Sequence, residues 1–113
     1  MGRSRNIENL SFEIKLLFRI SDMKENPFTK LVIEKQLTEE EYNEIFNLLE
    51  FLNSKLEVQS EEGLLNFESL LVLFVGILNE KLNPIETLNA LKKEGYYPSL
   101  IGTLLKTHEN IKD

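Results

Sequence analysis

The feature that most constrains this fold is a series of helix start signals spread along the chain. Asn26 and Asn83 each precede a proline, and Glu41 follows Thr38 by three residues. A short polar side chain can accept hydrogen bonds from the unpaired amides of a first helical turn, where proline is also tolerated. Thr38 and Glu41 have the spacing of a capping box, and Asn66 is a fourth start signal. Four helices are therefore expected to begin at or just after these residues.

Two glycines supply matching stop signals. Gly63 and Gly95 suit the left-handed conformation that ends many helices. Start and stop signals together predict an all-α fold, a compact multihelical bundle of about six helices. A chain of 113 residues with 42% hydrophobic residues can bury one core, so residues 1–113 should form a single domain with residues 1–5 as a frayed basic tail. The expected helices are 6–23, 27–36, 39–61, 67–82, 84–94 and 98–110.

The third and fourth expected helices differ in how far their apolar residues extend around the helix. The third has one apolar face, whereas the fourth is apolar on nearly all sides, as is typical of a helix surrounded by others. Gly76 lies on the narrow polar strip of the fourth helix, where alanine would be favoured by about 1 kcal/mol. We expect a neighbouring helix to approach closely at that strip.

The first expected helix carries two apolar stripes on nearly opposite sides. Such a helix is either central to its domain or packed between its own core and another subunit. Phe51 favours the second interpretation, because it projects from the polar side of the third helix. We therefore predict a homo-oligomer. One stripe contains Ile7, Leu10, Ile14, Leu17 and Phe18, and the candidate interface consists of Phe12, Leu16 and Ile20 from the other stripe together with Phe51.

Charge and composition narrow the functional classes. A net charge of −6 opposes direct binding to nucleic acid or to an anionic membrane, because both require Lys and Arg to contact phosphates. The absence of cysteine excludes disulfides and thiolate ligands. No segment has the pattern of a signal peptide or of a transmembrane helix. We expect a cytoplasmic protein without a membrane segment.

Residues suited to catalysis are few. Glu39, Glu40, Glu41 and Glu44 form the densest acidic group, but negative charge in a first helical turn is explained by the helix dipole. His108 is the only histidine, and no partner lies within helical reach to orient it. No catalytic residue, cofactor or metal site is predicted.

The segment from Asn79 to Tyr97 contains a joint between two helices. Five of its residues are not fully explained by that joint, and they combine aromatic and charged side chains suited to protein contacts. The alternative is that Asn79 and Glu80 only satisfy neighbouring helix ends. The candidate protein-contact residues are Asn79, Glu80, Lys81, Tyr96 and Tyr97.

One block of sequence and several scattered residues together indicate a family resemblance. The most specific block is LVLFVGILNEKL, from Leu71 to Leu82, and other matching residues include Asp22-Met23, Pro27-Phe28, Leu37, Glu40-Glu41, Phe67, Leu70, Glu86-Thr87, Ala90-Leu91, Gly95 and Tyr97. With them, the chain resembles a small family of uncharacterised Bacillus proteins typified by YhaI. The resemblance implies an all-helical fold, a Gram-positive bacterial or phage-related origin, and self-association. The family has no assigned activity, so it implies no catalytic residue.

These observations predict a non-enzymatic cytoplasmic protein that acts by protein interaction or regulation. Its acidic balance favours a protein partner with a basic surface. One alternative is a small acidic inhibitor of a basic, nucleic-acid-handling protein. Another is a small hydrolase or metal-assisted enzyme that uses the carboxylates of residues 39–44, with His108 brought close by folding. A concave site holding several titratable residues in hydrogen-bond geometry would favour the enzyme.

Overall fold

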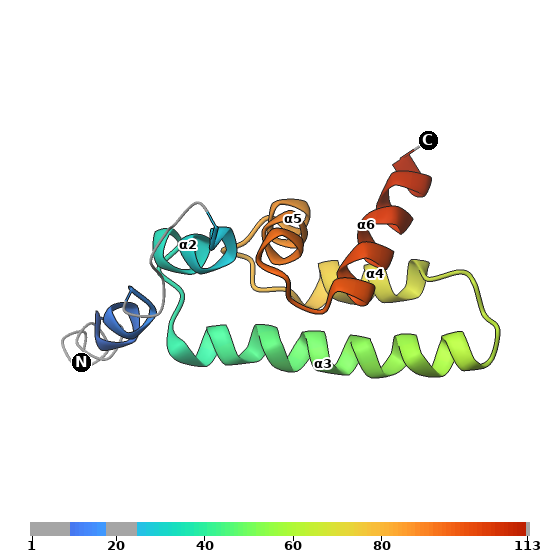
Figure 1. The fold of residues 1–113 in the computed structure, drawn as a ribbon, viewed down its shortest axis with the longest axis horizontal. Coiled ribbons are helices and arrows are strands. Elements are labelled where there is room, and N and C mark those ends of the chain that lie inside the picture. The colour runs from blue at the N-terminus through green and yellow to red at the C-terminus, as the bar shows by residue number, and fades with distance from the viewer. Residues whose placement is uncertain (1–9, 18–24, 113) are drawn as a thin grey trace.

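The fold is an assembly of helices laid along one long helix (Figure 1). A computed structural model describes residues 10–17 and 25–112, and all regular secondary structure in these ranges is helical, as the sequence predicted. None of the helices described is long and apolar enough to cross a membrane. Residues 10–17 are helical, and they are followed by α2 (Pro27–Glu34), α3 (Glu39–Glu61), α4 (Glu68–Ile77), α5 (Pro84–Glu94) and α6 (Pro98–Lys112).

Local signals set most helix ends. Thr38 Oγ1 accepts a hydrogen bond from Glu41 N at 3.1 Å, and the Glu41 carboxylate accepts one from Thr38 N at 2.9 Å, so the capping box forms at the start of α3. Asn83 Oδ1 accepts a hydrogen bond from the amide of Glu86 at 2.9 Å at the start of α5. Gly95 ends α5 with φ 89°, a left-handed conformation that suits glycine. The bounds of α3 and α5 agree with those expected from the sequence.

The fourth helix is shorter than expected. It ends at Ile77 rather than Leu82, because Leu78 leaves the helical conformation with φ −54° and ψ 139°. The side chain of Asn79 then accepts a hydrogen bond from Lys81 N at 2.9 Å, which closes a turn. Leu78 and Leu82 are both buried, so the apolar pattern continues through a segment that is not helical. We call residues 78–82 the α4–α5 joint.

The core lies between α3 and the other helices. Phe28 of α2 is fully buried, and its ring lies 5.8 Å from that of Phe46 and 6.1 Å from that of Tyr96, measured between centroids. Full burial of a large apolar side chain contributes about 1.5–3 kcal/mol, so this centre supplies much of the stability. The largest side chains that are fully buried are Phe28, Phe74, Leu16, Leu37, Leu49, Leu52, Leu70, Leu88, Leu91, Leu100, Ile101 and Leu104.

The helices described in residues 10–17 and 25–112 do not surround α4. It packs against α3 and α6 through Leu70, Leu71 and Phe74, whereas Val72 is 67% exposed and Ile77 is 55% exposed. The expected close approach at Gly76 is also wrong, because a Cβ built on Gly76 would have no contact within 4 Å beyond its own helix. A run of apolar residues shows that a helix could be buried, but ten residues with neighbours on one side expose the opposite face.

The burial of the two stripes of the first helix differs from what the sequence suggested. Phe12 and Leu16, assigned to a subunit interface, are 5% and 1% exposed within the single chain, and the Phe12 ring lies 5.2 Å from that of Tyr42. Ile20 lies outside the described residues. Periodicity reveals two stripes but does not determine which one meets the core. The accessible stripe consists of Leu10, Ile14 and Leu17, each about half exposed.

Candidate functional site

An open groove separates α3 from the end of α4 and the first residues of the α4–α5 joint. Its volume is about 770 Å³. Apolar residues on both walls contribute to it, together with exposed polar residues, among which Glu44 and Glu80 are acidic. We call it the α3–α4 groove. Its lining consists of Glu41, Glu44, Ile45, Asn47, Leu48, Phe51, Gly76, Ile77, Leu78, Asn79, Glu80 and Lys81.

The groove unites residues that the sequence assigned to separate roles. Phe51 was a candidate for an oligomer interface, whereas Asn79, Glu80 and Lys81 were candidates for contact with another protein; all four line the groove. Phe51 is 47% exposed, and Lys55 Nζ lies 5.1 Å from its ring centroid, within reach of a cation–π interaction. A large aromatic side chain that is half exposed inside a concave surface is available to contact a partner.

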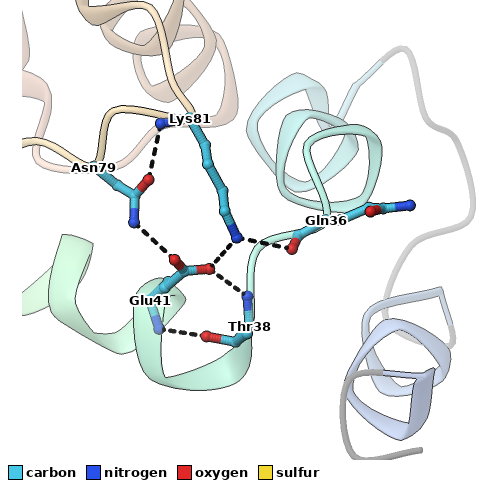
Figure 2. A network of polar contacts seen from close by, with 5 residues as sticks. All are labelled: Gln36, Thr38, Glu41, Asn79 and Lys81. Carbon is cyan, nitrogen blue, oxygen red and sulfur yellow. Dashed lines mark hydrogen bonds and ion pairs between the residues drawn. The ribbon is translucent and has the colours of Figure 1, made fainter. Parts of the chain in front are cut away.

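One wall of the groove is fixed by a polar network around Glu41 (Figure 2). Glu41 Oε1 accepts hydrogen bonds from Thr38 N at 2.9 Å and from Lys81 Nζ at 2.8 Å, and Oε2 accepts one from Asn79 Nδ2 at 3.0 Å. Lys81 Nζ also donates to the backbone oxygen of Gln36 at 3.4 Å. Residues about forty positions apart are therefore held together, and the α4–α5 joint is tied to the start of α3. We call this network the Glu41 clamp.

The Glu41 clamp keeps its carboxylate ionised. Burial alone would raise the pKa of Glu41, but hydrogen bonds from Lys81, Thr38 and Asn79, together with the positive charge of Lys81, lower that pKa to about 2. A general base works best with a pKa near the operating pH. With donors on both of its oxygens, Glu41 is suited to holding the groove wall and poorly suited to proton transfer.

Tyr96 and Tyr97 do not belong to the groove. The Tyr96 ring packs at 5.0 Å from that of Phe46, and burial, followed by the nearby Tyr42 and Glu94, raises the pKa of Tyr96 to about 12. Tyr97 is half-buried against the core and has a left-handed backbone with φ 43°. The five-residue contact patch is therefore not one surface: Asn79, Glu80 and Lys81 lie at the groove, whereas both tyrosines pack against the core.

Sequence reasoning missed a second glutamate that joins distant helices. Glu94, the last residue of α5, accepts hydrogen bonds on Oε1 from the amides of Phe28 and Thr29 at 2.9 and 3.0 Å, and on Oε2 from Thr29 Oγ1 at 2.8 Å. Asn26 was expected to serve these amides of α2. The only sequence signal is indirect: the first turn of α2 has no acidic residue of its own, and Glu94 supplies the missing negative charge.

The remaining candidates for chemistry do not converge on the groove. Glu39 and Glu40 are exposed in the first turn of α3, as the helix dipole favours, and His108 is half-buried on α6 and is not among the lining residues. Within residues 10–17 and 25–112, no group of three or more His, Cys, Asp or Glu residues is placed to hold a metal ion. Among the described residues, the groove therefore offers an apolar surface that is bordered by acidic side chains.

A family model described as "Protein of unknown function (DUF1878)" matches residues 1–109. The match includes both walls of the groove, the Glu41 clamp and Glu94. It assigns no activity, so a function has to be derived from the residues of the groove.

Proposed function

The chain belongs to the DUF1878 family, whose function is unknown, and from this premise we propose that it is a non-enzymatic cytoplasmic interaction protein whose α3–α4 groove binds an amphipathic, basic segment of a protein. The observation that carries this proposal is the position of Phe51. This half-exposed aromatic side chain lines a groove of about 770 Å³ together with apolar residues of α3 and α4. An amphipathic helix that lays its apolar face into such a groove is a recurrent mode of protein recognition.

Gly76 supports this interpretation, because it leaves one wall of the groove open. Glycine inside a helix costs about 1 kcal/mol relative to alanine, and none of the described residues fills the space that its missing side chain leaves. Exposed Ile77 follows Gly76 on the same wall. A partner side chain could therefore approach the α4 backbone at Gly76 while contacting Ile77 and Phe51.

The charge of α3 supports a basic partner. This helix contains seven glutamates and one lysine, a net charge of −6 that equals the net charge of the whole chain. Glu44 and Glu80 line the groove and are exposed, whereas Lys81, the basic residue of the lining, is paired with Glu41. Lys and Arg residues beside the apolar face of a partner would meet complementary charge, which raises the rate of association and selects the partner.

The Glu41 clamp supports binding rather than catalysis. It fixes the α4–α5 joint through Asn79 and Lys81, and a surface that is already ordered loses less conformational entropy when a partner binds. The enzyme alternative has less support, because Glu41 is engaged on both oxygens and His108 lies outside the groove lining.

A synthetic amphipathic peptide of leucine and lysine tests the proposal. Titrated into the ¹⁵N-labelled protein, it should shift the backbone amide signals of Phe51, Gly76 and Glu80. Phe51→Ser should weaken binding about tenfold, which corresponds to about 1.4 kcal/mol. Val72→Ser is the matched control, because Val72 is exposed on α4 but does not line the groove. Equal weakening by both substitutions, or equal binding of a leucine and glutamate peptide, would contradict the proposal.

A further inference from the structure

We infer that the segment bound in the α3–α4 groove is the accessible stripe of residues 10–17 from a second copy of this chain. The inference rests on the proposed function, since it takes the groove to be a surface for protein contact. The stripe consists of Leu10, Ile14 and Leu17, all large apolar side chains that the single chain leaves about half exposed. Within residues 10–17 and 25–112, the structure therefore leaves both this apolar helix face and the apolar groove accessible.

The spacing of the stripe fits the groove. Leu10, Ile14 and Leu17 occupy positions i, i+4 and i+7 of a helical segment, which is the pattern of anchors used by helices that dock in apolar grooves. Phe12 and Leu16 bury the opposite side of the same segment in the core, so the segment is already ordered when its stripe meets a partner. The entropic cost of docking is correspondingly lower than for an unfolded peptide.

A chain cannot fill its own groove with this stripe in the observed arrangement. Phe12 packs against Tyr42, which places residues 10–17 on the Tyr42 side of α3. Tyr42 and Phe51 are nine residues apart, which at about 100° per residue is close to half a rotation of the helix. Phe51 in the groove therefore points away from the side of α3 that contacts residues 10–17. A second copy can supply the stripe without disturbing the Phe12 contact.

Charge complementarity points to the same occupant. Residues 1–20 contain four Lys or Arg residues and two Glu residues, a net charge of +2, whereas α3 carries −6. Residues 10–17 contain one Glu and one Lys, so this positive charge comes from Arg3, Arg5 and Arg19, which flank the stripe in the sequence, and the groove borders the most acidic helix. This is the partner chemistry that the exposed Glu44 and Glu80 favour.

Reciprocal docking would close the assembly. Each copy offers one stripe and one groove, so two copies related by a twofold axis could cover both apolar surfaces of each chain. Closed twofold dimers of this kind are the commonest homo-oligomers. We therefore expect a dimer in which residues 10–17 of each copy lie against α3 and α4 of the other.

Cross-linking between engineered cysteines tests the contact directly, because the natural chain has none. Ile14→Cys protein is mixed with Ile77→Cys protein carrying a larger tag and treated with a short bismaleimide. A mixed cross-linked species should form in good yield on a denaturing gel. Val72→Cys replaces Ile77→Cys in the control, because Val72 is at least as accessible as Ile77 but lies outside the groove lining. Cross-linking no stronger than in this control would overturn the inference.

Light scattering coupled to size exclusion gives an independent test. The natural chain should be a dimer at tens of micromolar, and Ile14→Asp and Phe51→Asp should each raise the dimer dissociation constant about tenfold or more. Mixing the two variants should recover part of the dimer, because one intact stripe and one intact groove remain. The side chains of Ile14 and Phe51 are about half exposed, so circular dichroism should show a folded protein for each variant.

A monomeric natural chain that still binds the leucine and lysine peptide through Phe51 would overturn this inference and leave the proposed function standing. Failure of both tests would overturn both.

Discussion

Glu41 and Glu94 perform the same task in two regions of the molecule. Each carboxylate accepts hydrogen bonds from groups distant in sequence and so joins one helix to another part of the fold. Glu41 ties the start of α3 to the α4–α5 joint, and Glu94 ties the end of α5 to the start of α2. The difference lies in their partners. Glu41 also serves its own helix through the capping box with Thr38, whereas Glu94 accepts three hydrogen bonds from Phe28 and Thr29 at the start of α2.

This difference determines what each glutamate contributes. The donors that meet Glu94 include the hydroxyl of Thr29, whose side chain is buried beside the fully buried Phe28. The donors that meet Glu41 lie beside an open groove, and its main partner, Lys81, is 41% exposed. Water can replace a lost acceptor at the groove more easily than at the start of α2. We therefore expect the loss of Glu94 to reduce the free energy of unfolding more than the loss of Glu41 does.

The largest effect is expected from Glu94→Ala. It removes the acceptor for two backbone amides and one buried hydroxyl, so unfolding in urea should show a loss of about 2–3 kcal/mol. Glu109→Ala, which removes an exposed carboxylate from α6, is the control and should change stability by less than about 0.5 kcal/mol. If the two substitutions have equal effects, the contacts of Glu94 contribute little, and the comparison fails.

Local chemistry explains which features the sequence could predict. The capping box of Thr38 and Glu41, the cap at Asn83 and the stop at Gly95 each involve residues within a few positions, and the bounds of α3 and α5 followed from them. Only some of the residues that line the groove were predicted from the sequence to contact a partner. Phe51 was recognised because it lies on the polar side of an amphipathic helix, and Asn79 to Lys81 because helix ends alone did not explain them.

The features that the sequence could not predict depend on tertiary contacts. Glu94 meets Phe28 across 66 positions, a pairing that no local pattern encodes. The choice between the two stripes of the first helix depends on which side meets Tyr42, and both are equally apolar in sequence. The end of α4 at Ile77 is followed by the Asn79 turn and its hydrogen bond to Glu41, whereas the apolar periodicity in the sequence continues unbroken to Leu82.

The next largest effect is expected from Glu41, whose contribution to the free energy of unfolding should depend on pH. The pKa of Glu41 is about 2 in the folded protein against an ordinary value of 4.5, so its contribution is fully present above pH 4.5 and is lost as the pH falls towards 2. Relative to the natural chain, Glu41→Gln should lose about 1–2 kcal/mol at pH 7, since partial exposure to solvent reduces the full value of the shift. Urea unfolding at several pH values should show this difference shrinking below pH 4.5.

The control for this experiment is Glu40→Gln. Glu40 neighbours Glu41 in the first turn of α3 but is exposed, so its substitution removes the same formal charge outside the clamp. Its effect should be a few tenths of a kcal/mol, as expected for a charge near a helix N-terminus. A difference between Glu41→Gln and the natural chain that stays constant from pH 7 to pH 3 would show that ionisation of Glu41 does not stabilise the joint.

A smaller effect is expected from the pair of Lys81 and Glu41. Lys81→Met keeps the apolar stem of the side chain and removes the charge, and it should cost about 0.5–1 kcal/mol because the ion pair is partly exposed. A double-mutant cycle with Glu41→Gln isolates the coupling between the two side chains. Lys106→Met on α6 is an exposed control. Strictly additive losses would mean that Thr38 and Asn79, rather than Lys81, account for the contribution of Glu41.

The last expected effect, a gain in stability from Gly76→Ala, has the opposite sign to the losses above. Alanine favours the helix by up to about 1 kcal/mol, and its Cβ would meet no atom within 4 Å beyond its own helix. Gly95→Ala, at φ 89°, should instead lose about 1 kcal/mol. If the Glu41 clamp determines where α4 ends, Gly76→Ala should leave the amide signals of Asn79 and Lys81 unchanged while raising the urea midpoint. Large shifts at both amides would mean that the flexibility of Gly76, and not the hydrogen bond between Glu41 and Asn79, sets the end of α4.

Peptide binding to the Gly76→Ala protein gives a second result. Weaker binding of the leucine and lysine peptide to a more stable Gly76→Ala protein would show that the open wall at Gly76 serves the partner rather than the fold.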